Sequence, residues 1–257
     1  MDNLFSRTLN SIQSAGIINA YRHAKEYALD LVFPKACLRC GSEGAWCCES
    51  CTAKIIVVPP QCFVCHTLAP ATTKNPAGKT CEHCRKNTPV QYFFSPFIYQ
   101  DETVRTLIQA LKYERIRSLD AWFAAALADY LHYFQIVIPA DALIIPIPLH
   151  RRRHRSRGFN QSELIAQALG TRLGVPVACD VLIKKSATVP QADLPRRERL
   201  TNITGSFSIA QGMEEKLHDK TVIILDDVKT TGATITETAY ILKKSGARRV
   251  WALTVAH

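Results

Sequence analysis

Short apolar runs alternate along this chain with stretches of helical spacing, and this alternation predicts an α/β fold. The apolar runs lie at Tyr92–Tyr99, Ala142–Ile147, Val222–Leu225 and Arg248–Val255. Each run is short enough for one strand, and continuous apolar runs are typical of strands that helices cover on both sides. The pattern therefore predicts an open parallel sheet with helices on both faces.

Helical spacing is clearest at Val104, Leu107, Ile108 and Leu111, which would share one face of a helix. Further helices are predicted at residues 1–33, Leu119–Phe134, Ser162–Leu173 and Ile235–Leu242. The first of these ends at Pro34. Because its charges balance and it lacks a basic face, we expect it to pack against protein rather than lie on a membrane surface.

The length of the chain leaves room for one α/β domain and a smaller module. It has 257 residues, of which 47% are hydrophobic, an ordinary share for a globular protein. No apolar run reaches the roughly 18–20 residues of a transmembrane helix. The N-terminus lacks the basic stretch and apolar core of a secretory signal. We therefore expect a cytoplasmic protein without a transmembrane segment.

The positive charge of the chain is concentrated in one region. The net charge is +10, and residues 150–200 contain eleven Lys or Arg against four Asp or Glu. A basic segment of this kind favours polyanionic ligands such as pyrophosphate, a nucleotide or a nucleic-acid backbone. The alternative is a solvated basic surface.

Nine of the ten cysteines lie between residues 37 and 84, and eight of them form four Cys-x-x-Cys motifs. The motif members are Cys37, Cys40, Cys48, Cys51, Cys62, Cys65, Cys81 and Cys84. Each motif brings two thiolates to one side of a tight turn, and two motifs complete a tetrahedral zinc site. Disulfides are the alternative, which the repeated spacing and the missing secretion signal disfavour. We predict two structural zinc ions in a double zinc ribbon.

The spacing leaves open which cysteines share an ion. Sequential pairing is the simplest, with the first four cysteines around one ion and the last four around the other. One alternative is an interleaved pairing. Another is that Cys47 replaces Cys48 as a ligand. We expect His66 and His83 to lie outside the metal sites, and all-cysteine sites leave no open position for catalysis.

The most informative segment joins the run Val222–Leu225 to the carboxylates Asp226 and Asp227 and to the turn Thr230–Thr234. Ligands of open α/β sheets bind at the carboxyl ends of the strands. The turn offers hydroxyls and free backbone N–H groups to a phosphate, and the carboxylates suit Mg²⁺ or sugar hydroxyls. A solvated strand end is the alternative. A Walker A loop is excluded, because no Gly-Lys-Ser/Thr follows a glycine at the required spacing.

This segment, Val222–Thr234, closely resembles the stretch that binds 5-phosphoribosyl-1-pyrophosphate (PRPP) in type I phosphoribosyltransferases. From Phe33 to Ala256 the chain resembles the ComF family of competence proteins. The resemblance also rests on the eight motif cysteines, Leu111–Tyr113, Pro146–His150, Arg157–Gln161, Gln191, Arg199 and Asn202. It departs from the family only in the additional Cys47.

The resemblance implies three parts of the chain. These are an N-terminal helix at 1–33, a double zinc-ribbon domain at 34–90 and a type I phosphoribosyltransferase-like domain at 91–257. It also implies a role in natural transformation, the uptake and handling of incoming single-stranded DNA.

Similarity to type I phosphoribosyltransferases further implies the roles of individual residues. PRPP would contact Asp226, Asp227, Thr230, Thr231, Gly232, Ala233, Thr234, Leu149, His150, Arg151, Arg157, Asn160 and Gln161. Residues Lys184–Asn202 resemble a loop that closes over PRPP, with Lys185 and Arg197 acting beside the two aspartates in catalysis. The alternative for Arg157–Gln161 is a helix-starting turn in which Asn160 is a cap. The alternative for Lys184–Asn202 is a solvated basic loop.

Three hypotheses follow. The chain is an enzyme that transfers phosphoribose from PRPP with Mg²⁺ to an unknown acceptor, or it is a single-stranded DNA-binding protein that uses PRPP only as a ligand. In the second case the ribbons and Arg151, Arg152, Arg153 and Arg155 would hold the DNA. Phe63, Tyr92, Phe93 and Phe94 could stack on bases, and the alternative is that these aromatic side chains belong to the core. In the third, the ribbons dock a helicase or translocase of the uptake machinery.

Overall fold

The computed structural model describes residues 35–72, 75–185 and 205–257. The chain divides into two compact units, Met1–Lys54 and Ile55–His257. The helix expected at residues 1–33 and most of the closing loop expected at Lys184–Asn202 lie outside the described residues. Within the described ranges, every helix is too short or too polar to cross a membrane.

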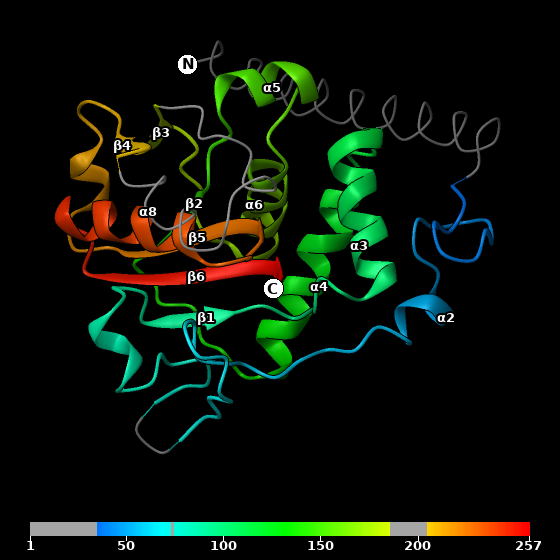
Figure 1. The fold of residues 1–257 in the computed structure, drawn as a ribbon, viewed down its shortest axis with the longest axis horizontal. Coiled ribbons are helices and arrows are strands. Elements are labelled where there is room, and N and C mark those ends of the chain that lie inside the picture. Colours follow the sequence, from blue (N-terminus) through cyan, green and yellow to red (C-terminus); the bar gives the residue numbers. More distant parts are fainter. Residues whose placement is uncertain (1–34, 73–74, 186–204) are drawn as a thin grey trace, which may run out of the picture. The chain divides into compact units, whose positions relative to one another are not determined.

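A parallel sheet with the strand order β1-β6-β5-β2 organises the described part of the larger unit (Figure 1). Its strands are β1 Tyr92–Phe94, β2 Ala142–Pro146, β5 Thr221–Val228 and β6 Arg249–Ala256. The central strand β5 pairs in parallel with β2 on one side and with β6 on the other. Because parallel strands end at the same edge, the segments that follow β2 and β5 meet there.

The first strand is shorter than predicted. The run Tyr92–Tyr99 forms β1 only as far as Phe94, since Pro96 has no N–H group to continue the ladder. Phe97 then makes a single parallel bridge to Ala256 at the end of β6. The other three strands lie where the apolar runs predict them.

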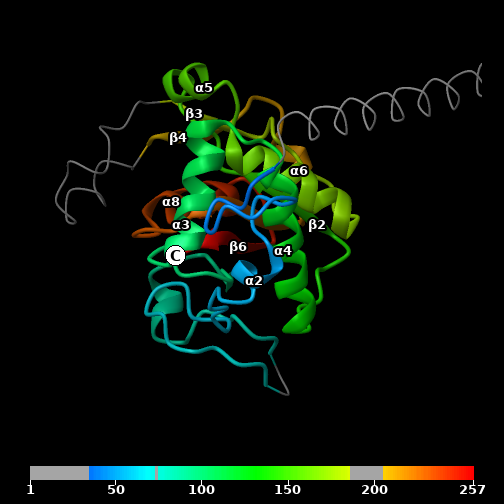
Figure 2. The same ribbon diagram turned by 90° about the vertical axis from the view of Figure 1, so that its right-hand side faces the viewer.

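Helices cover both faces of this sheet (Figures 1 and 2). The main helices are α3 Glu102–Gln109, α4 Leu119–Tyr133, α6 Gln161–Leu173 and α8 Ala233–Lys244. The helix α8 packs on Val222 and Ile224, while α6 contacts β2 and β5 and packs against α4. Since side chains alternate along a strand, the buried Ile223 and Leu225 face the side opposite to Val222 and Ile224. The predicted α/β architecture is confirmed.

Side-chain caps fix where two helices near the functional residues begin. Asp101 Oδ1 accepts a hydrogen bond from Val104 N at 3.1 Å at the start of α3. Asn160 Oδ1 accepts one from Ser162 N at 3.2 Å at the start of α6. The helix α3 continues into a π-helical turn, Ala110–Glu114. Such turns are often found at functional sites.

A small antiparallel pair, β3 Leu182–Lys184 and β4 Phe207–Ile209, packs on the same core as α8. The described part of the larger unit also contains three short helical segments: α5 Arg151–Arg157 and the 3₁₀ turns Cys84–Lys86 and Glu214–Leu217. Strand β4 contacts α8, so the antiparallel pair of β3 and β4 lies beside the helix that follows β5.

The two cysteine clusters fall in different units. Cluster one (Cys37, Cys40, Cys48 and Cys51) lies in the unit that ends at Lys54, together with the short helix α2 Glu49–Thr52. Cluster two (Cys62, Cys65, Cys81 and Cys84) lies in the unit that contains the sheet. The domain expected at residues 34–90 is therefore divided between Lys54 and Ile55.

Cluster two is hydrogen-bonded to the edge of the sheet. Thr80 N donates to Gln91 O at 2.8 Å, and Phe93 N of β1 donates to Gly78 O at 2.9 Å. A Cβ atom on Gly78 would lie 2.7 Å from the ring of Phe94, and its φ is +79°. Only glycine allows this close approach, so the backbone that leads into Cys81 is joined directly to β1.

Candidate functional site

A cleft of about 270 Å³ opens at the carboxyl ends of β2 and β5. Residues Ile147–Leu149 after β2 form one of its walls, and Asp226–Val228 at the end of β5 with Lys229–Ile235 after it form another. Five basic and two acidic residues are among its described lining, so the cleft carries a net positive charge: Lys112, Arg153, Arg157, Lys184, Lys229, Asp226 and Asp227. This charge suits a ligand with several phosphate groups.

The two carboxylates lie at the end of β5 in different surroundings. Asp226 Oδ1 accepts a hydrogen bond from Ser162 Oγ at 3.1 Å, and Asp227 Oδ2 accepts one from Gln161 Nε2 at 2.6 Å. Both donors start α6, so this helix fixes the pair. Burial, together with the adjacent charge of Asp227, raises the pKa of Asp226 to about 7.

Asp227 also forms an ion pair with Lys112, whose Nζ lies 2.8 Å from Asp227 Oδ2. The two side chains are only 16% and 8% exposed. Lys112 comes from the π-helical turn after α3, so an element far away in sequence completes the carboxylate site. Sequence reasoning had not assigned it a role, although it lies four residues after Ile108 on the buried face, where a lysine needs an anionic partner.

The turn after β5 starts α8 at Gly232, whose φ of +77° is left-handed. Thr231 Oγ1 accepts a hydrogen bond from Ala233 N at 3.3 Å. A Cβ atom on Gly232 would lie 3.0 Å from the Phe63 ring and 3.1 Å from Lys229 Cε, so the turn requires glycine. The first N–H groups of α8 lack partners within the helix and open onto a cleft that suits phosphate. We call Lys229–Thr234 the phosphate loop.

Lys229, the first residue of the phosphate loop, is 4% exposed. Its ammonium lies 3.2 Å from His66 Nε2 and 5.1 and 5.4 Å from the ring centroids of Phe63 and Phe93. Burial lowers its pKa to about 8. The described residues give it no carboxylate partner, so an anion bound to the loop would supply a counter-charge.

Most of the predicted PRPP contacts line this cleft. Those brought together are Leu149, Arg157, Gln161, Asp226, Asp227, Thr230, Thr231, Gly232, Ala233 and Thr234. The side chain of Asn160 is buried and caps α6, and its Nδ2 donates to Ile147 O at 3.0 Å. It therefore supports the wall after β2, as the capping alternative anticipated.

The remaining predicted residues lie outside the described lining of the cleft. They are His150, Arg151 and Lys185, and Arg197 lies outside the described residues. His150 Nδ1 accepts a hydrogen bond from Arg152 N at 3.2 Å and caps α5. Their roles stay predictions. Lys184, which borders the cleft, instead places its ammonium 4.9 Å from the Phe207 ring centroid.

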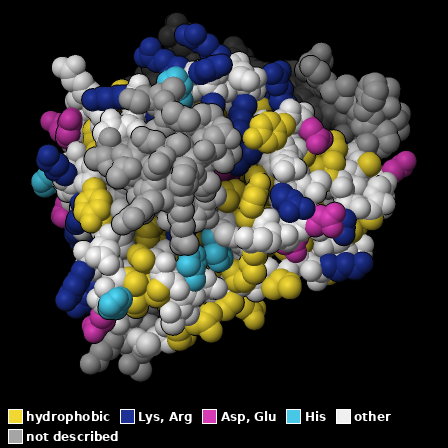
Figure 3. Space-filling model, in the orientation of Figure 1, with side chains coloured by type: hydrophobic (Ala, Val, Ile, Leu, Met, Phe, Trp, Pro, Cys, Tyr) yellow, Lys and Arg dark blue, Asp and Glu magenta, His cyan; other side chains and the backbone are white. Residues whose placement is uncertain are grey.

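The basic run after β2 forms the helix α5, which the sequence pattern did not predict. Arg151, Arg152, Arg153 and Arg155 are all exposed on it. Lys and Arg side chains gather over α5 at the top of the view in Figure 3. The side chain of Arg157 instead turns inward, donating to Gln161 Oε1 at 3.0 Å and lying over the Tyr113 ring. α5 thus presents a positive surface beside the cleft wall.

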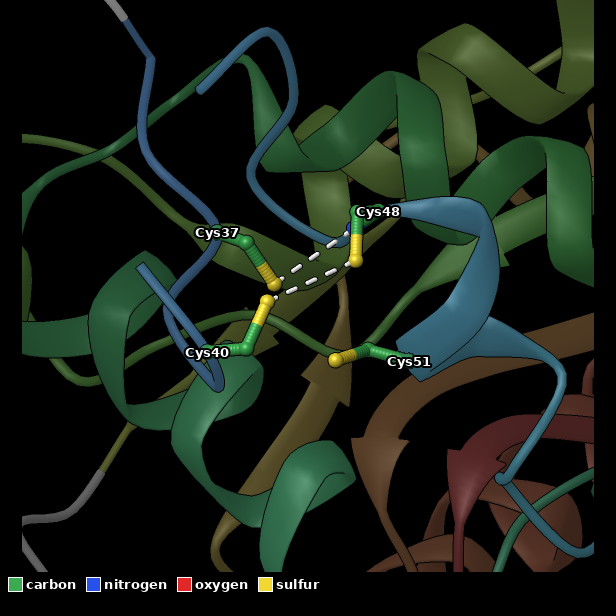
Figure 4. A group of neighbouring side chains, drawn as sticks. All are labelled: Cys37, Cys40, Cys48 and Cys51. Atoms are coloured by element: carbon green, nitrogen blue, oxygen red, sulfur yellow. Dashed lines mark hydrogen bonds between the residues drawn. The ribbon is translucent and has the colours of Figure 1, made fainter. Parts of the chain in front are cut away.

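Each cysteine cluster has its four sulfur atoms within 4.8 Å of one another. Figure 4 shows the side chains of cluster one pointing toward a common centre, with Cys40 Sγ and Cys48 Sγ 3.6 Å apart. This is the sequential pairing. Cys47 lies outside the group, is buried, and accepts a hydrogen bond from Thr52 Oγ1 at 3.2 Å. Four converging thiolates with no other ligand type fit a structural Zn²⁺ ion.

The thiols of the two clusters show the same electrostatic pattern. A hydroxyl hydrogen bond, from Ser50 in one case and Thr67 in the other, lowers the pKa of Cys48 to about 5 and of Cys65 to about 6. Burial raises the pKa of Cys51 and of Cys84 to about 12. The crowded thiols cannot all ionise without a cation, which is the condition a zinc ion satisfies.

Comparison with known proteins places this site in a family. Residues 160–257 match the model of the phosphoribosyl transferase domain, a segment that includes α6, β5, the phosphate loop and α8. Glutamine PRPP amidotransferase from B. subtilis is a structural neighbour with 18% identity, covering 54% of this chain and 26% of its own, at a TM-score of 0.35.

Two curated relatives cover more of the chain. Competence protein F of Haemophilus influenzae is 30% identical over 179 residues, which are 67% of this chain and 77% of that protein. DNA utilization protein YhgH of Salmonella typhi is 34% identical over 190 residues, 69% of this chain and 80% of that protein. With the phosphoribosyl transferase domain and the two four-cysteine groups, these relatives show that the chain belongs to the ComF family.

Proposed function

We propose that the cleft binds PRPP with Mg²⁺ and that the chain transfers phosphoribose to an acceptor, releasing pyrophosphate. One observation carries this proposal: paired carboxylates and a helix-starting phosphate loop open onto the same positively charged cleft. The relatives are named for competence and for DNA utilization, so we place this activity in the handling of incoming DNA.

The residues of the cleft have complementary roles in this proposal. The phosphate loop and the N-terminus of α8 hold the 5-phosphate, while Asp226 and Asp227 accept hydrogen bonds from the ribose hydroxyls. Lys112 fixes the orientation of the Asp227 carboxylate through the 2.8 Å ion pair. Ser162 and Gln161 fix both carboxylates from α6.

Breaking the bond between C1 of the ribose and pyrophosphate builds positive charge on the sugar and negative charge on the leaving group. Asp226 and Asp227 stabilise the sugar in their ionised forms, which for Asp226 requires a pH above its raised pKa of about 7. Arg153 and Arg157 line the side of the cleft after β2, where pyrophosphate would leave, with Leu149–Arg151 and Lys185 as further predicted contacts. Mg²⁺, when bound, supplies charge neutralisation at pyrophosphate, and carboxylate oxygens are ligands that it accepts.

Calorimetric titration of PRPP with and without Mg²⁺ tests this proposal. We expect Mg²⁺-dependent binding that weakens at least tenfold in Asp226→Asn and is lost in the double variant with Asp227→Asn. Asp129→Asn, which changes an exposed carboxylate on α4, is the matched control. The amide introduced by Asp226→Asn retains an oxygen that can accept from Ser162 Oγ, so the single variant should stay folded. A folded, zinc-loaded wild-type protein without PRPP affinity would end the proposal.

A second candidate function is the binding of single-stranded DNA by α5. The observation that favours it is the exposure of four arginines on one short helix, beside a cleft that is itself positive. Arginine contacts to phosphates release counterions, so affinity should fall steeply with salt. The expected stacking of bases on Phe63 and Phe93 is disfavoured, since both rings are buried in the core.

Fluorescence titration of a single-stranded oligonucleotide at several salt concentrations tests α5. Changing Arg151, Arg152, Arg153 and Arg155 to Gln should reduce the salt slope by about 2–3, because each phosphate contact on single strands contributes about 0.7. The control is an equal charge change at exposed positions elsewhere, Arg105, Arg172, Lys220 and Lys244. Equal slopes in the two variants would exclude α5 as the binding surface.

We also propose that each cysteine cluster holds one structural zinc ion. Elemental analysis should give two zinc ions per chain, and removing two cysteines from either cluster should leave one. A third ion, or zinc that persists after both clusters are changed, would require other ligands.

A further inference from the structure

The first motif of cluster two contains a backbone conformation that its counterpart in cluster one achieves with glycine. His66, which follows Cys65, has a φ of +59°, and Gly41, which follows Cys40, has a φ of +79°. A left-handed backbone is unfavourable for a residue with a side chain but not for glycine. A histidine therefore occupies a position that favours glycine, and the contacts of its side chain account for this.

The side chain of His66 reaches the phosphate loop. Its Nε2 lies 3.2 Å from Lys229 Nζ, so the ammonium donates when Nε2 is unprotonated. The imidazole also stacks on the ring of His257 at 5.4 Å and 13°, and His257 Nδ1 lies 3.0 Å from Ser95 Oγ. His66 is thus fixed between the end of the chain after β6 and the first residue of the phosphate loop.

Phe63, within the same Cys-x-x-Cys motif, makes a second contact. It is 3% exposed, and its ring centroid lies 5.1 Å from Lys229 Nζ. The edge of the ring lies 3.0 Å from the position of a Cβ atom on Gly232. The turn of cluster two that contains Phe63 and His66 therefore contacts the phosphate loop at two positions, Lys229 and Gly232.

Charge links the same two elements. Lys229 is buried against aromatic rings, and within the described residues it has no carboxylate partner. Four thiolates around Zn²⁺ retain negative charge, so a filled cluster two would stabilise the buried ammonium, and a bound phosphate would add to this.

We propose that cluster two positions the phosphate loop: Phe63 and His66 hold Lys229 and Gly232, so that zinc at cluster two, and not at cluster one, sets the affinity of the loop for a sugar phosphate. His66 and Phe63 are positioning residues that act through Lys229. The identification of the ligand as a sugar phosphate rests on the proposed function, whereas the dependence of the loop's position on cluster two does not.

The variant His66→Gly tests this directly, because glycine accepts the left-handed backbone and removes only the ring. The control is His83→Gly in the second motif of the same cluster. Both histidines are exposed, but among the described residues only His66 of the two contacts Lys229. The first readout, hydrogen exchange of the Val228–Ala233 backbone without ligand, should become at least tenfold faster in His66→Gly and stay unchanged in His83→Gly. Equal exchange in both variants would overturn the proposal.

The second readout is the affinity for PRPP with Mg²⁺, measured on the full zinc-loaded chain. We expect a loss of about tenfold in His66→Gly and in Lys229→Met, with no further loss when the two are combined, since His66 acts through Lys229. Additive losses would contradict that dependence. If the wild-type protein binds no PRPP, the proposed function fails, while hydrogen exchange still decides the present inference.

Discussion

The two cysteine clusters have the same ligands and similar thiol electrostatics, yet they lie in different surroundings. Cluster one belongs to the unit that ends at Lys54, and its first turn passes through Gly41. Cluster two belongs to the unit of the sheet, and its equivalent turn passes through His66, which contacts the phosphate loop. A four-cysteine motif therefore indicates a metal site, whereas the residues between and after the cysteines decide what that site supports.

The largest effect that would test this comparison is the removal of two ligands from either cluster. Cys81→Ser with Cys84→Ser should destabilise the sheet unit by about 3 kcal/mol or more, because the backbone before Cys81 is hydrogen-bonded to β1. Cys48→Ser with Cys51→Ser should leave the main unfolding transition in place. Calorimetric melting curves of the two double variants would measure these changes in stability. Equal losses would mean that both clusters stabilise the sheet.

The next largest effect is expected at the ion pair of Lys112 with Asp227, which supports the site independently of zinc. Lys112→Met should destabilise the protein by about 3 kcal/mol, since it leaves the buried Asp227 carboxylate without its ion pair. Chemical denaturation would measure the change, with Lys220→Met as an exposed control. Hydrogen exchange of the phosphate loop should remain as in the wild type. A loosened loop in Lys112→Met would show that the two supports are coupled.

A smaller effect of opposite sign is expected at Asp226. Its pKa is raised in the folded protein, so the folded state holds a proton between about pH 4 and pH 7 that the unfolded state has lost, and stability falls as pH rises through this range. Asp226→Asn should stabilise the free protein by about 2 kcal/mol at pH 8 and by almost nothing below pH 4. Denaturation curves at both pH values would check this. A destabilised variant at pH 8 would contradict the pKa shift.

The smallest effect is expected from making the turn of cluster one resemble that of cluster two. A Cβ atom on Gly41 would meet nothing within 4 Å, so Gly41→His should cost about 1 kcal/mol from its left-handed backbone alone. Zinc content and PRPP affinity should be unchanged. The free energy of unfolding from denaturant curves, with elemental analysis, would measure this. Reduced PRPP affinity would show that cluster one also acts on the site.

Much of the fold was predictable because it depends on local patterns. The runs at Ala142–Ile147 and Val222–Leu225 became β2 and the core of β5, and the spacing from Val104 to Leu111 became α3 with its π-helical continuation. Helix α5 was missed because its basic sequence has no apolar face, and what starts it is a cap by His150 Nδ1. The residues around His150 do not by themselves indicate that its side chain caps a helix.

The candidate site was predictable in part for the same reason. Asp226, Asp227 and the phosphate loop are contiguous, so their chemistry could be recognised without coordinates. Lys112 was part of the motif Leu111–Tyr113, but no role was predicted for it and nothing near it in the sequence indicated Asp227 as its partner. His66 was expected outside the metal sites, and it does lie outside the four-cysteine group. Its partner Lys229 is 163 residues away, and no periodicity connects such positions.

Spacing along the chain was sufficient to predict the alternation of strands and helices, the eight cysteines of the two clusters, and the carboxylates and glycine of the phosphate loop. Backbone periodicity and local turns depend on residues that are close in sequence. The folded chain was needed to show that Lys112 pairs with Asp227, that Asn160 supports the wall rather than lining the cleft, and that cluster two contacts Lys229. Those contacts join distant segments, and burial in the folded core is what makes an uncompensated charge there unfavourable and its partner necessary.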